Sequence, residues 1–258
     1  MKFENTEVFN FEGALRGMRN PLESWKKSDS FIKSPHNDFI IGKNDLKLAQ
    51  TLIKAGSEHR KFMRQIFVSV DITASLYWWK EFDTYKVGTV ANSTSTMHKL
   101  ASTPITKDCF EMDDYSDVRF EEDGDTYGIL NDQWDRTIYT CELLRQKYNE
   151  TKDIRYWKEL IRFLPESWLQ KRTVTMDYEN LLAVCSKGQR RFHKLTEWSK
   201  SFIDWARSLP YAQELIFFDK EPKLDFIIKY EDGIYKCRYS SGEEFESLDG
   251  VTWTETLQ

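Results

Sequence analysis

The sequence predicts an α+β protein in which helices dominate the middle of the chain and strands follow near its end. Residues 66–73 alternate, with aliphatic side chains at the even positions, which is the period of a half-buried strand. Residues 130–148 repeat apolar side chains at steps of three and four, as one face of a helix does. Two alternating segments near the C-terminus flank Asp232-Gly233, which is typical of a β-hairpin.

The first half of the chain reads as strand, helix, strand, helix. Residues 3–11 could form a first strand. Residues 44–55 predict a helix, because apolar side chains form a stripe and Gly56 can close it. After the alternating strand, the aromatic segment 77–86 suits a helix of about three turns, and we expect Gly88 to end it.

The second half is mostly helical. Residues 111–125 carry eight acidic residues against Arg119; their spacing fits no calcium loop, so a solvated excursion is the simpler interpretation. Beyond the long helix we expect helices at 154–163, 178–187 and 196–208, and a short strand at 172–176. We divide the chain into a main domain, residues 1–220, and a β-rich extension, residues 221–258.

Composition excludes several classes of protein. The 258 residues are 40% hydrophobic and 15% aromatic, enough for a substantial core, and the net charge of −5 gives no general attraction to nucleic acid. No apolar run reaches the roughly 18 residues of a membrane span, and the N-terminus has no signal-peptide pattern, so we expect a cytoplasmic protein with neither membrane nor nucleic acid as a partner. The four cysteines form no Cys-x-x-Cys pair and read as buried free thiols.

Several short segments occur in the order found in one enzyme family. The chain has Ala14-Leu15-Arg16, then an Asp-x-x-Leu-x-x-x-Leu segment at residues 45–52, then Gly56 followed by His59. These segments resemble the flavin-dependent thymidylate synthases, also called thymidylate synthase complementing proteins. The resemblance covers roughly residues 5–215, and the C-terminal hairpin has no counterpart in it.

The family signature Arg-His-Arg-x-x-Ser-x-Asn-Glu-x-Ser-x-Arg falls on residues 84–96, and most of it is altered. Lys86 keeps a positive charge where the family has its second Arg, and Thr89 and Thr94 keep hydroxyl groups where it has Ser. Four other positions do not match the signature: Thr84, Tyr85, Ala91 and Thr96. Replacing Arg by Thr removes both the charge and the two-pronged donor geometry that suits phosphate.

Other family landmarks are also changed. The Arg-Gln pair upstream of the signature becomes Lys80-Glu81, and residues 162–165 resemble Arg-x-x-Leu-Pro with one residue missing. Residues 177–181 resemble Asn-x-Arg-x-Leu with both polar positions changed. Arg190 or Arg191 falls near the Arg that contacts the nucleotide in the family.

The resemblance implies a mainly antiparallel sheet covered by helices, and a homotetramer that binds FAD. In that chemistry reduced flavin passes a hydride to a one-carbon unit that methylenetetrahydrofolate delivers to dUMP, with NADPH as a possible reductant. Carried over residue by residue, the candidates for holding FAD are His59, Lys80, Tyr85, Lys86, Thr89 and Asn92. The candidates for holding the pyrimidine nucleotide are Arg16, Thr94, Arg190 and Arg191. No catalytic residue is assigned.

Each candidate also has a purely structural interpretation. The lysines and arginines could be solvated surface residues, and Tyr85 could pack in the core or at a subunit interface. His59 could cap the preceding helix, and the run of short polar residues could cap a helix at Ser93 or Thr94. His98 and His193 stand apart from other possible metal ligands, so no metal site is expected.

Three functions therefore compete. The first is a divergent flavin-dependent enzyme that acts on a pyrimidine nucleotide. The second is a catalytically inactive relative that keeps the fold as a nucleotide-binding or oligomeric protein, because most of the signature is lost. The third is related chemistry on a different substrate, since changes around a site alter specificity as readily as they abolish the reaction.

Overall fold

A computed structural model of the chain describes residues 1–34, 38–113, 119–122, 125–218, 224–230, 233–239, 243–251 and 253–256. The chain divides into two compact units. The first unit consists of Met1–Glu4, Asp71–Thr84 and Ala91–Thr173. The second unit consists of Asn5–Val70, Tyr85–Val90 and Val174–Gln258.

Four strands form the main sheet, in the order β1 (Lys2–Phe9), β4 (Phe67–Ser75), β8 (Leu169–Asp177) and β5 (Val90–Ser93). The alternation in β4 is confirmed, because Val68, Val70 and Ile72 are fully buried while the side chains between them are half-buried. Strands β1, β4 and β8 continue from one unit into the other, so each unit holds one end of them.

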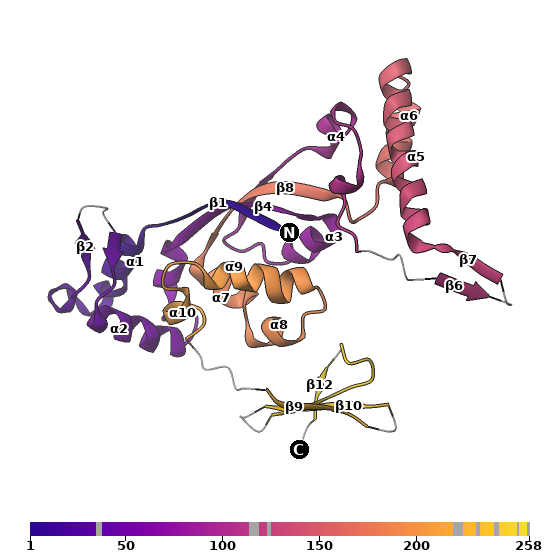
Figure 1. Ribbon diagram of the computed structural model, residues 1–258. Helices are drawn as coiled ribbons and strands as arrows, with labels where there is room; N and C mark the ends of the chain where they lie inside the picture. Colours follow the sequence, from indigo (N-terminus) through magenta and orange to yellow (C-terminus); the bar gives the residue numbers. More distant parts are fainter. Residues whose placement is uncertain are drawn as a thin grey trace. The chain divides into compact units, whose positions relative to one another are not determined.

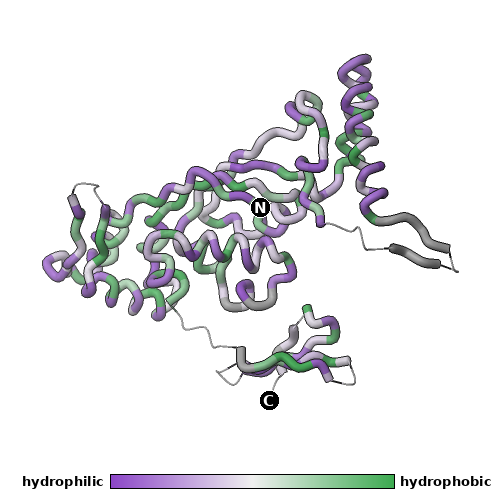
Figure 2. Tube along the Cα trace, viewed as in Figure 1, coloured by the Kyte–Doolittle hydropathy of each residue, from purple (hydrophilic) through white to green (hydrophobic). Residues whose placement is uncertain are grey.

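The first unit has a small helical core. Its helices are α3 (Leu76–Phe82), α4 (Thr96–Lys99), α5 (Leu130–Thr151) and α6 (Ile154–Phe163), with 3-10 turns η4 (Leu100–Ser102) and η5 (Lys107–Cys109). The long α5 packs against α6, and both alternate hydrophobic and hydrophilic segments as amphipathic helices do (Figure 2). The buried core side chains of this region are Leu100, Ile105, Phe110, Ile138, Cys141 and Leu160.

The acidic segment contains structure that the sequence did not reveal. Strands β6 (Arg119–Glu122) and β7 (Asp125–Ile129) pair antiparallel and lead into α5. The sequence did not predict this pairing, which begins inside the acidic segment at Arg119 and continues beyond it to Ile129. That the segment is solvated stays a prediction, because the burial of these strands lies outside the described residues. High charge hid the strands, because a charged segment lacks the apolar alternation by which strands are recognised.

The aromatic helix α3 is shorter than expected. Trp78, Trp79 and Phe82 are buried, with the Trp78 and Phe82 rings stacked at 5.1 Å between centroids. The helix ends at Phe82, so the predicted continuation to Lys86 is wrong, and Gly88 does not end it. Gly88 instead has a φ of 76° in the following loop, a left-handed conformation that favours glycine.

The second unit contains most of the remaining helices (Figure 1). They are α1 (Phe11–Met18), α2 (Lys43–Lys54), α7 (Tyr178–Val184), α8 (Lys187–Phe192), the π-helical η6 (Glu197–Phe202), α9 (Ile203–Arg207) and α10 (Ala212–Leu215). Short elements join them: 3-10 turns η1 (Asn20–Leu22), η2 (Trp25–Lys27) and η3 (Lys61–Gln65), and the antiparallel hairpin β2 (Phe31–Lys33) and β3 (Asp38–Ile40). The helix predicted at 44–55 is confirmed within one residue, and Gly56 follows it with a φ of 107°.

The C-terminal hairpin is confirmed. Strands β9 (Leu224–Lys229) and β10 (Tyr235–Tyr239) pair antiparallel, with Ile228 opposite Lys236. Two further strands, β11 (Glu244–Ser247) and β12 (Thr254–Glu255), extend the hairpin to an antiparallel sheet. The domain boundary at residue 220 stays a prediction, because residues 219–223 lie outside the described residues.

The structure is thus an α+β fold with antiparallel pairing in its hairpins and its C-terminal sheet, as predicted. In the described part of the chain no helix is both long enough and apolar enough to span a membrane. The four cysteines are free; Cys109 is half-buried and the other three are buried.

Candidate functional site

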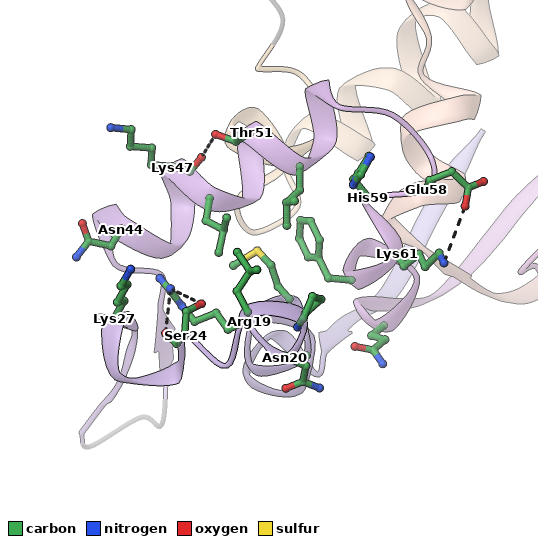
Figure 3. Close-up of a pocket in the computed structure, with 18 residues that line it drawn as sticks. Arg19, Asn20, Ser24, Lys27, Asn44, Lys47, Thr51, Glu58, His59 and Lys61 are labelled. Carbon is green, nitrogen blue, oxygen red and sulfur yellow. Dashed lines mark hydrogen bonds and ion pairs between the residues drawn. The ribbon is translucent and has the colours of Figure 1, made fainter.

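A pocket of about 1060 Å³ lies within the second unit, between α1, η1, α2 and the segment that leads into η3 (Figure 3). Its floor is apolar: Met18 and Phe62 are 6% and 4% exposed, and Leu48 and Leu52 are half-buried. The volume is at the upper end of the roughly 300–1,000 Å³ typical of ligand pockets. The pocket therefore has room for a large ligand with a flat or apolar body.

A buried ion pair joins two walls of this pocket. Arg19, directly after α1, places its Nε atom 2.5 Å from Oδ1 of Asp45 in the first turn of α2, and Nη1 donates to the carbonyl of Ser24 at 3.2 Å. The other carboxylate oxygen of Asp45 accepts hydrogen bonds from the hydroxyl groups of Ser28 and Ser30. Asp45 therefore fixes the start of α2 relative to η1 and η2.

The surroundings of Asp45 favour its charged form. Burial by itself would raise the pKa of this carboxyl. Hydrogen bonds from Ser28, Ser30 and Arg19, together with the Arg19 charge, outweigh burial and hold the pKa below its usual value. The ion pair is thus a structural support of the pocket, with Arg19 4% exposed and Asp45 fully buried.

The rim of the pocket is positively charged. Lys27, Lys47 and Lys61 line it and are exposed, and Figure 3 shows them on η2, α2 and the segment that begins η3. Among the described lining residues Glu58 is the one acid, and its carboxylate is 3.9 Å from the Lys61 ammonium. An apolar floor with a cationic rim suits a ligand that joins a ring system to an anionic group.

His59 lies at this pocket. It follows α2 in an exposed turn, where its backbone N–H donates to the carbonyl of Gly56 at 3.1 Å. The structure therefore places His59 beside Lys61 and the apolar floor. Its role in binding FAD stays a prediction.

Tyr85, Lys86 and Thr89 belong to loop 85–89 of the second unit. The side-chain amide of Asn180, on α7, donates to the carbonyls of Tyr85 at 3.4 Å and Val87 at 2.8 Å. Lys86 is exposed, while Thr89 is half-buried. The loop is therefore held by a residue about 90 positions later in the chain.

Tyr85 packs inside the second unit. Its hydroxyl accepts a hydrogen bond from Gln189 at 2.7 Å, and its ring lies 5.5 Å from that of Trp198. These contacts agree with the structural interpretation of Tyr85. A role in stacking on a flavin stays a prediction.

Lys80, Asn92 and Thr94 belong to the first unit. Lys80 is 70% exposed, and its ammonium is 2.7 Å from the carboxylate of Glu166. Asn92 is exposed on β5, and the backbone N–H of Thr94 donates to the carbonyl of Lys171 at 2.8 Å. All three roles stay predictions.

The helix cap expected near these residues is one position later. Ser95 precedes α4, and its hydroxyl accepts from the N–H of His98 at 3.2 Å. The suggested caps at Ser93 and Thr94 are therefore wrong, because Ser93 still belongs to β5 and the N–H of Thr94 is bonded to β8.

The remaining predicted residues lie elsewhere in the second unit. Arg16 is exposed and lines a different cavity of about 720 Å³, so it does not share the pocket of His59. Arg190 donates to the carbonyl of Cys185 at 2.7 Å and lies over the ring of Phe217. The side chain of Arg191 lies outside the described residues. Their substrate roles stay predictions.

Sequence reasoning missed a charged cluster beside the pocket. Arg60 and Arg64, which flank Lys61 and Phe62, both donate through Nε to the carboxylate of Glu179 on α7; the Arg60 distance is 2.9 Å. Burial would raise the pKa of Glu179, but these two donors outweigh burial and lower it. The run His59-Arg60-Lys61 indicates a basic cluster in the sequence. The sequence does not indicate that Glu179, 119 residues from Arg60, is its partner.

Within the ranges that the structure describes, no group of three or more His, Cys, Asp or Glu side chains is arranged to hold a metal ion.

The comparisons with solved structures identify the fold as that of the flavin-dependent thymidylate synthases, as the resemblance predicted. Thymidylate synthase X from Helicobacter pylori, crystallised with FAD and dUMP, superposes with a TM-score of 0.60 at 14% identity, covering 85% of this chain and 98% of that one. A second structure of the Helicobacter pylori enzyme, also with FAD and dUMP, gives 0.58 at 14% identity, covering 85% and 99%.

A third similar structure is the UMP/dUMP methylase PolB from Streptomyces cacaoi bound with 5-Br dUMP. Its TM-score is 0.53 at 12% identity, with 84% of this chain and 95% of that one covered. No family model and no curated protein matches the sequence. At 12–14% identity these likenesses establish the fold and leave the chemistry to the residues of this chain.

Proposed function

We propose that the protein binds FAD and a pyrimidine nucleotide such as dUMP, and transfers a one-carbon (methyl) unit to the nucleotide. Methylenetetrahydrofolate and NADPH are the proposed co-substrates. One observation carries the proposal: a large pocket with an apolar floor and a lysine rim contains His59, which aligns with a family histidine. The fold shared with enzymes crystallised with FAD and dUMP supports it.

The pocket fits a flavin nucleotide. Met18 and Phe62 offer the apolar surface that a flat ring system needs, and His59 and Lys61 are the residues that would hold a diphosphate beside it. When bound, FAD would supply a hydride to the one-carbon unit. The chain itself would bind and orient the ligand and exclude water from the apolar floor.

Two of the four cysteines, Cys141 and Cys185, are unsuited to act as nucleophiles. Burial raises the pKa of Cys141 to about 11 and that of Cys185 to about 12. Both groups are therefore protonated thiols near neutral pH, and a thiolate is the form that attacks a substrate. Transfer of a hydride from a flavin requires no such attack.

The proposal is tested first by the absorbance spectrum of the purified protein after incubation with FAD and removal of the unbound flavin by gel filtration. A band at about 450 nm that stays with the protein shows bound flavin and makes the later tests possible. Titration with dUMP, and turnover of dUMP with methylenetetrahydrofolate and NADPH, then test the substrate and the reaction. A protein that stays colourless with FAD and leaves dUMP unchanged would contradict the proposal.

We also propose the homotetramer that the resemblance implies. Light scattering of the purified protein tests it directly, since one chain has a mass of 30.7 kDa. A monomeric protein at micromolar concentration would contradict this part of the proposal alone.

A second candidate function is a catalytically inactive relative that binds a nucleotide or serves as an oligomeric scaffold. Tyr85 favours the inactive relative, because it stands where the family signature has its histidine. Its hydroxyl is hydrogen-bonded to Gln189, and its ring packs near Trp198. In that case dUMP or FAD binds without turnover, and the gene does not restore growth of a thymidine-requiring host. Growth of that host would exclude the inactive relative.

A further inference from the structure

Four consecutive residues at the start of α7 contact three different segments of the second unit: residues 60–66, residues 85–89 and Pro210. Asp177 caps the helix: its carboxylate accepts a hydrogen bond from the N–H of Asn180 at 2.8 Å. Asp177 also lies against Gly88, because a Cβ added to Gly88 would come within 2.6 Å of Oδ2 of Asp177. The N–H of Tyr178 donates to the carbonyl of Ile66 at 3.0 Å, and its hydroxyl donates to the carbonyl of Pro210. The start of α7 is thus a junction.

The next two residues connect this junction to the pocket and to loop 85–89. Glu179 is 13% exposed and accepts from both Arg60 and Arg64, on either side of the pocket residues Lys61 and Phe62. Asn180 is 9% exposed and holds the loop through two of its carbonyls. These contacts come from adjacent residues of one helical turn, which moves as a unit.

We propose that Glu179 is a positioning residue that couples the η3 wall of the pocket to loop 85–89. Its two charge-assisted hydrogen bonds fix the first turn of α7 on η3, and that turn sets where Asn180 presents its amide to the loop. A ligand that orders η3 therefore also orders the loop, although Glu179 has no hydrogen bond to the loop among the described residues. The effect of a bound ligand, which is the ligand half of this inference, rests on the proposed function. The coupling between the two segments does not.

Hydrogen–deuterium exchange of the full chain without ligand tests the coupling. In Glu179→Gln we expect amides of both segments, 60–65 and 85–89, to exchange about tenfold faster, since charge-assisted hydrogen bonds to η3 are weakened. Glu58→Gln is the matched control, because Glu58 lies on the same segment, is 84% exposed and is held, among the described residues, by no ion pair shorter than its 3.9 Å contact with Lys61. Faster exchange at 60–65 with no change at 85–89 would overturn the coupling.

Two further variants separate positioning from general loss of structure. Arg64→Gln removes the more exposed of the two arginines and leaves the Arg60–Glu179 bond, so we expect this variant to fold. If Glu179→Gln unfolds, the same exchange measurement is made on Arg64→Gln. Arg64→Lys retains the charge and should restore slow exchange at 85–89. Asn180→Ala should release 85–89 but leave 60–65 protected, which identifies the Asn180 amide as the contact that joins α7 to the loop. Uniformly faster exchange across the second unit in Arg64→Gln would overturn it.

FAD serves as the probe for the ligand half. In the natural sequence FAD should slow exchange at both 60–65 and 85–89, and in Arg64→Gln it should slow exchange at 60–65 alone. If FAD slows both segments equally in the variant, the coupling is wrong. If FAD does not bind the natural sequence, the proposed function fails, and the measurements without ligand still decide the coupling.

Discussion

Arg19 and Asp45 form a buried ion pair, with 2.5 Å between Nε and Oδ1, at the joint between two walls of the pocket. Arg19 is 4% exposed and Asp45 is fully buried, so each charge depends on the other for compensation. Arg19 lines the pocket, and Asp45 directly follows the lining residue Asn44. The ion pair therefore ties the stability of this region to the shape of the pocket.

Asp45→Asn should destabilise the protein by about 3–5 kcal/mol, because it leaves the Arg19 guanidinium buried without an opposite charge. The free energy of unfolding from urea titration measures this. Asp38→Asn, an exposed aspartate on β3, is the control and should change stability by less than about 0.5 kcal/mol. Equal effects of the two substitutions would mean that the pair is not a support.

Glu142 should make the stability of the protein depend on pH in acid. Hydrogen bonds from Arg145 lower the pKa of this carboxyl from 4.5 to about 2, helped by the N–H of Ile105. Because the folded-state pKa is depressed, the stabilisation is fully present above pH 4.5 and is lost as the pH falls towards 2. The side chain is 20% exposed, and we expect a contribution of at most about 3 kcal/mol, because solvent screening reduces it.

The measurement is the difference in unfolding free energy between the natural sequence and Glu142→Gln, near pH 6 and near pH 3. We expect this difference to shrink in acid. Glu150→Gln is the control, since the Lys147–Glu150 pair is exposed and should contribute less than about 1 kcal/mol at either pH. A difference that stays constant with pH would contradict the assignment.

Gly88→Ala should cost more stability than Gly56→Ala. Both glycines have a positive φ, 76° and 107°, so alanine strains either backbone by about 1–2 kcal/mol. At Gly88 the new Cβ would also lie 2.6 Å from Oδ2 of Asp177, whereas at Gly56 nothing lies within 4 Å. Thermal unfolding of both variants measures the difference, and equal losses would show that the loop moves away from Asp177 freely.

Local pattern was sufficient to predict several elements of this fold. The alternation in β4 and the apolar stripe of α2 are written into consecutive residues, and both elements form where expected. Helix α6 matches its predicted bounds, 154–163, because an Asp153 cap and Leu164-Pro165 define its ends. Whether such a segment forms a helix or a strand depends on burying one apolar face, and the spacing of apolar residues in the sequence shows that face.

Long-range contacts set the parts that were not predicted. Tyr85 and Lys86 were expected to continue the aromatic helix. They lie instead in a loop whose carbonyls and Tyr85 hydroxyl are held by Asn180 and Gln189, 93 to 104 residues away. The same limit applies to the pocket: His59 was found through the family resemblance, but the gathering of Lys27, Lys47 and Lys61 around one cavity depends on how α2 and η3 pack on α1. A solvated lysine and a rim lysine look alike in sequence.

The lysine rim gives the sharpest test of the pocket. Lys61→Gln should weaken FAD binding by about tenfold, because a hydrogen bond from a charged group to phosphate contributes about 1.5–3 kcal/mol. The natural sequence should lose affinity steeply between low and high salt, and the variant less steeply, since one cation fewer contributes. Flavin fluorescence titrations at two salt concentrations measure both effects.

Lys26→Gln is the matched control for this prediction. Lys26 is exposed on the same turn, η2, as Lys27, but it does not line the pocket. Removing it changes the net charge of the protein by the same amount as removing Lys61. If the two variants bind FAD equally well, the rim acts only through the overall field of the protein, and the ligand lies outside this pocket.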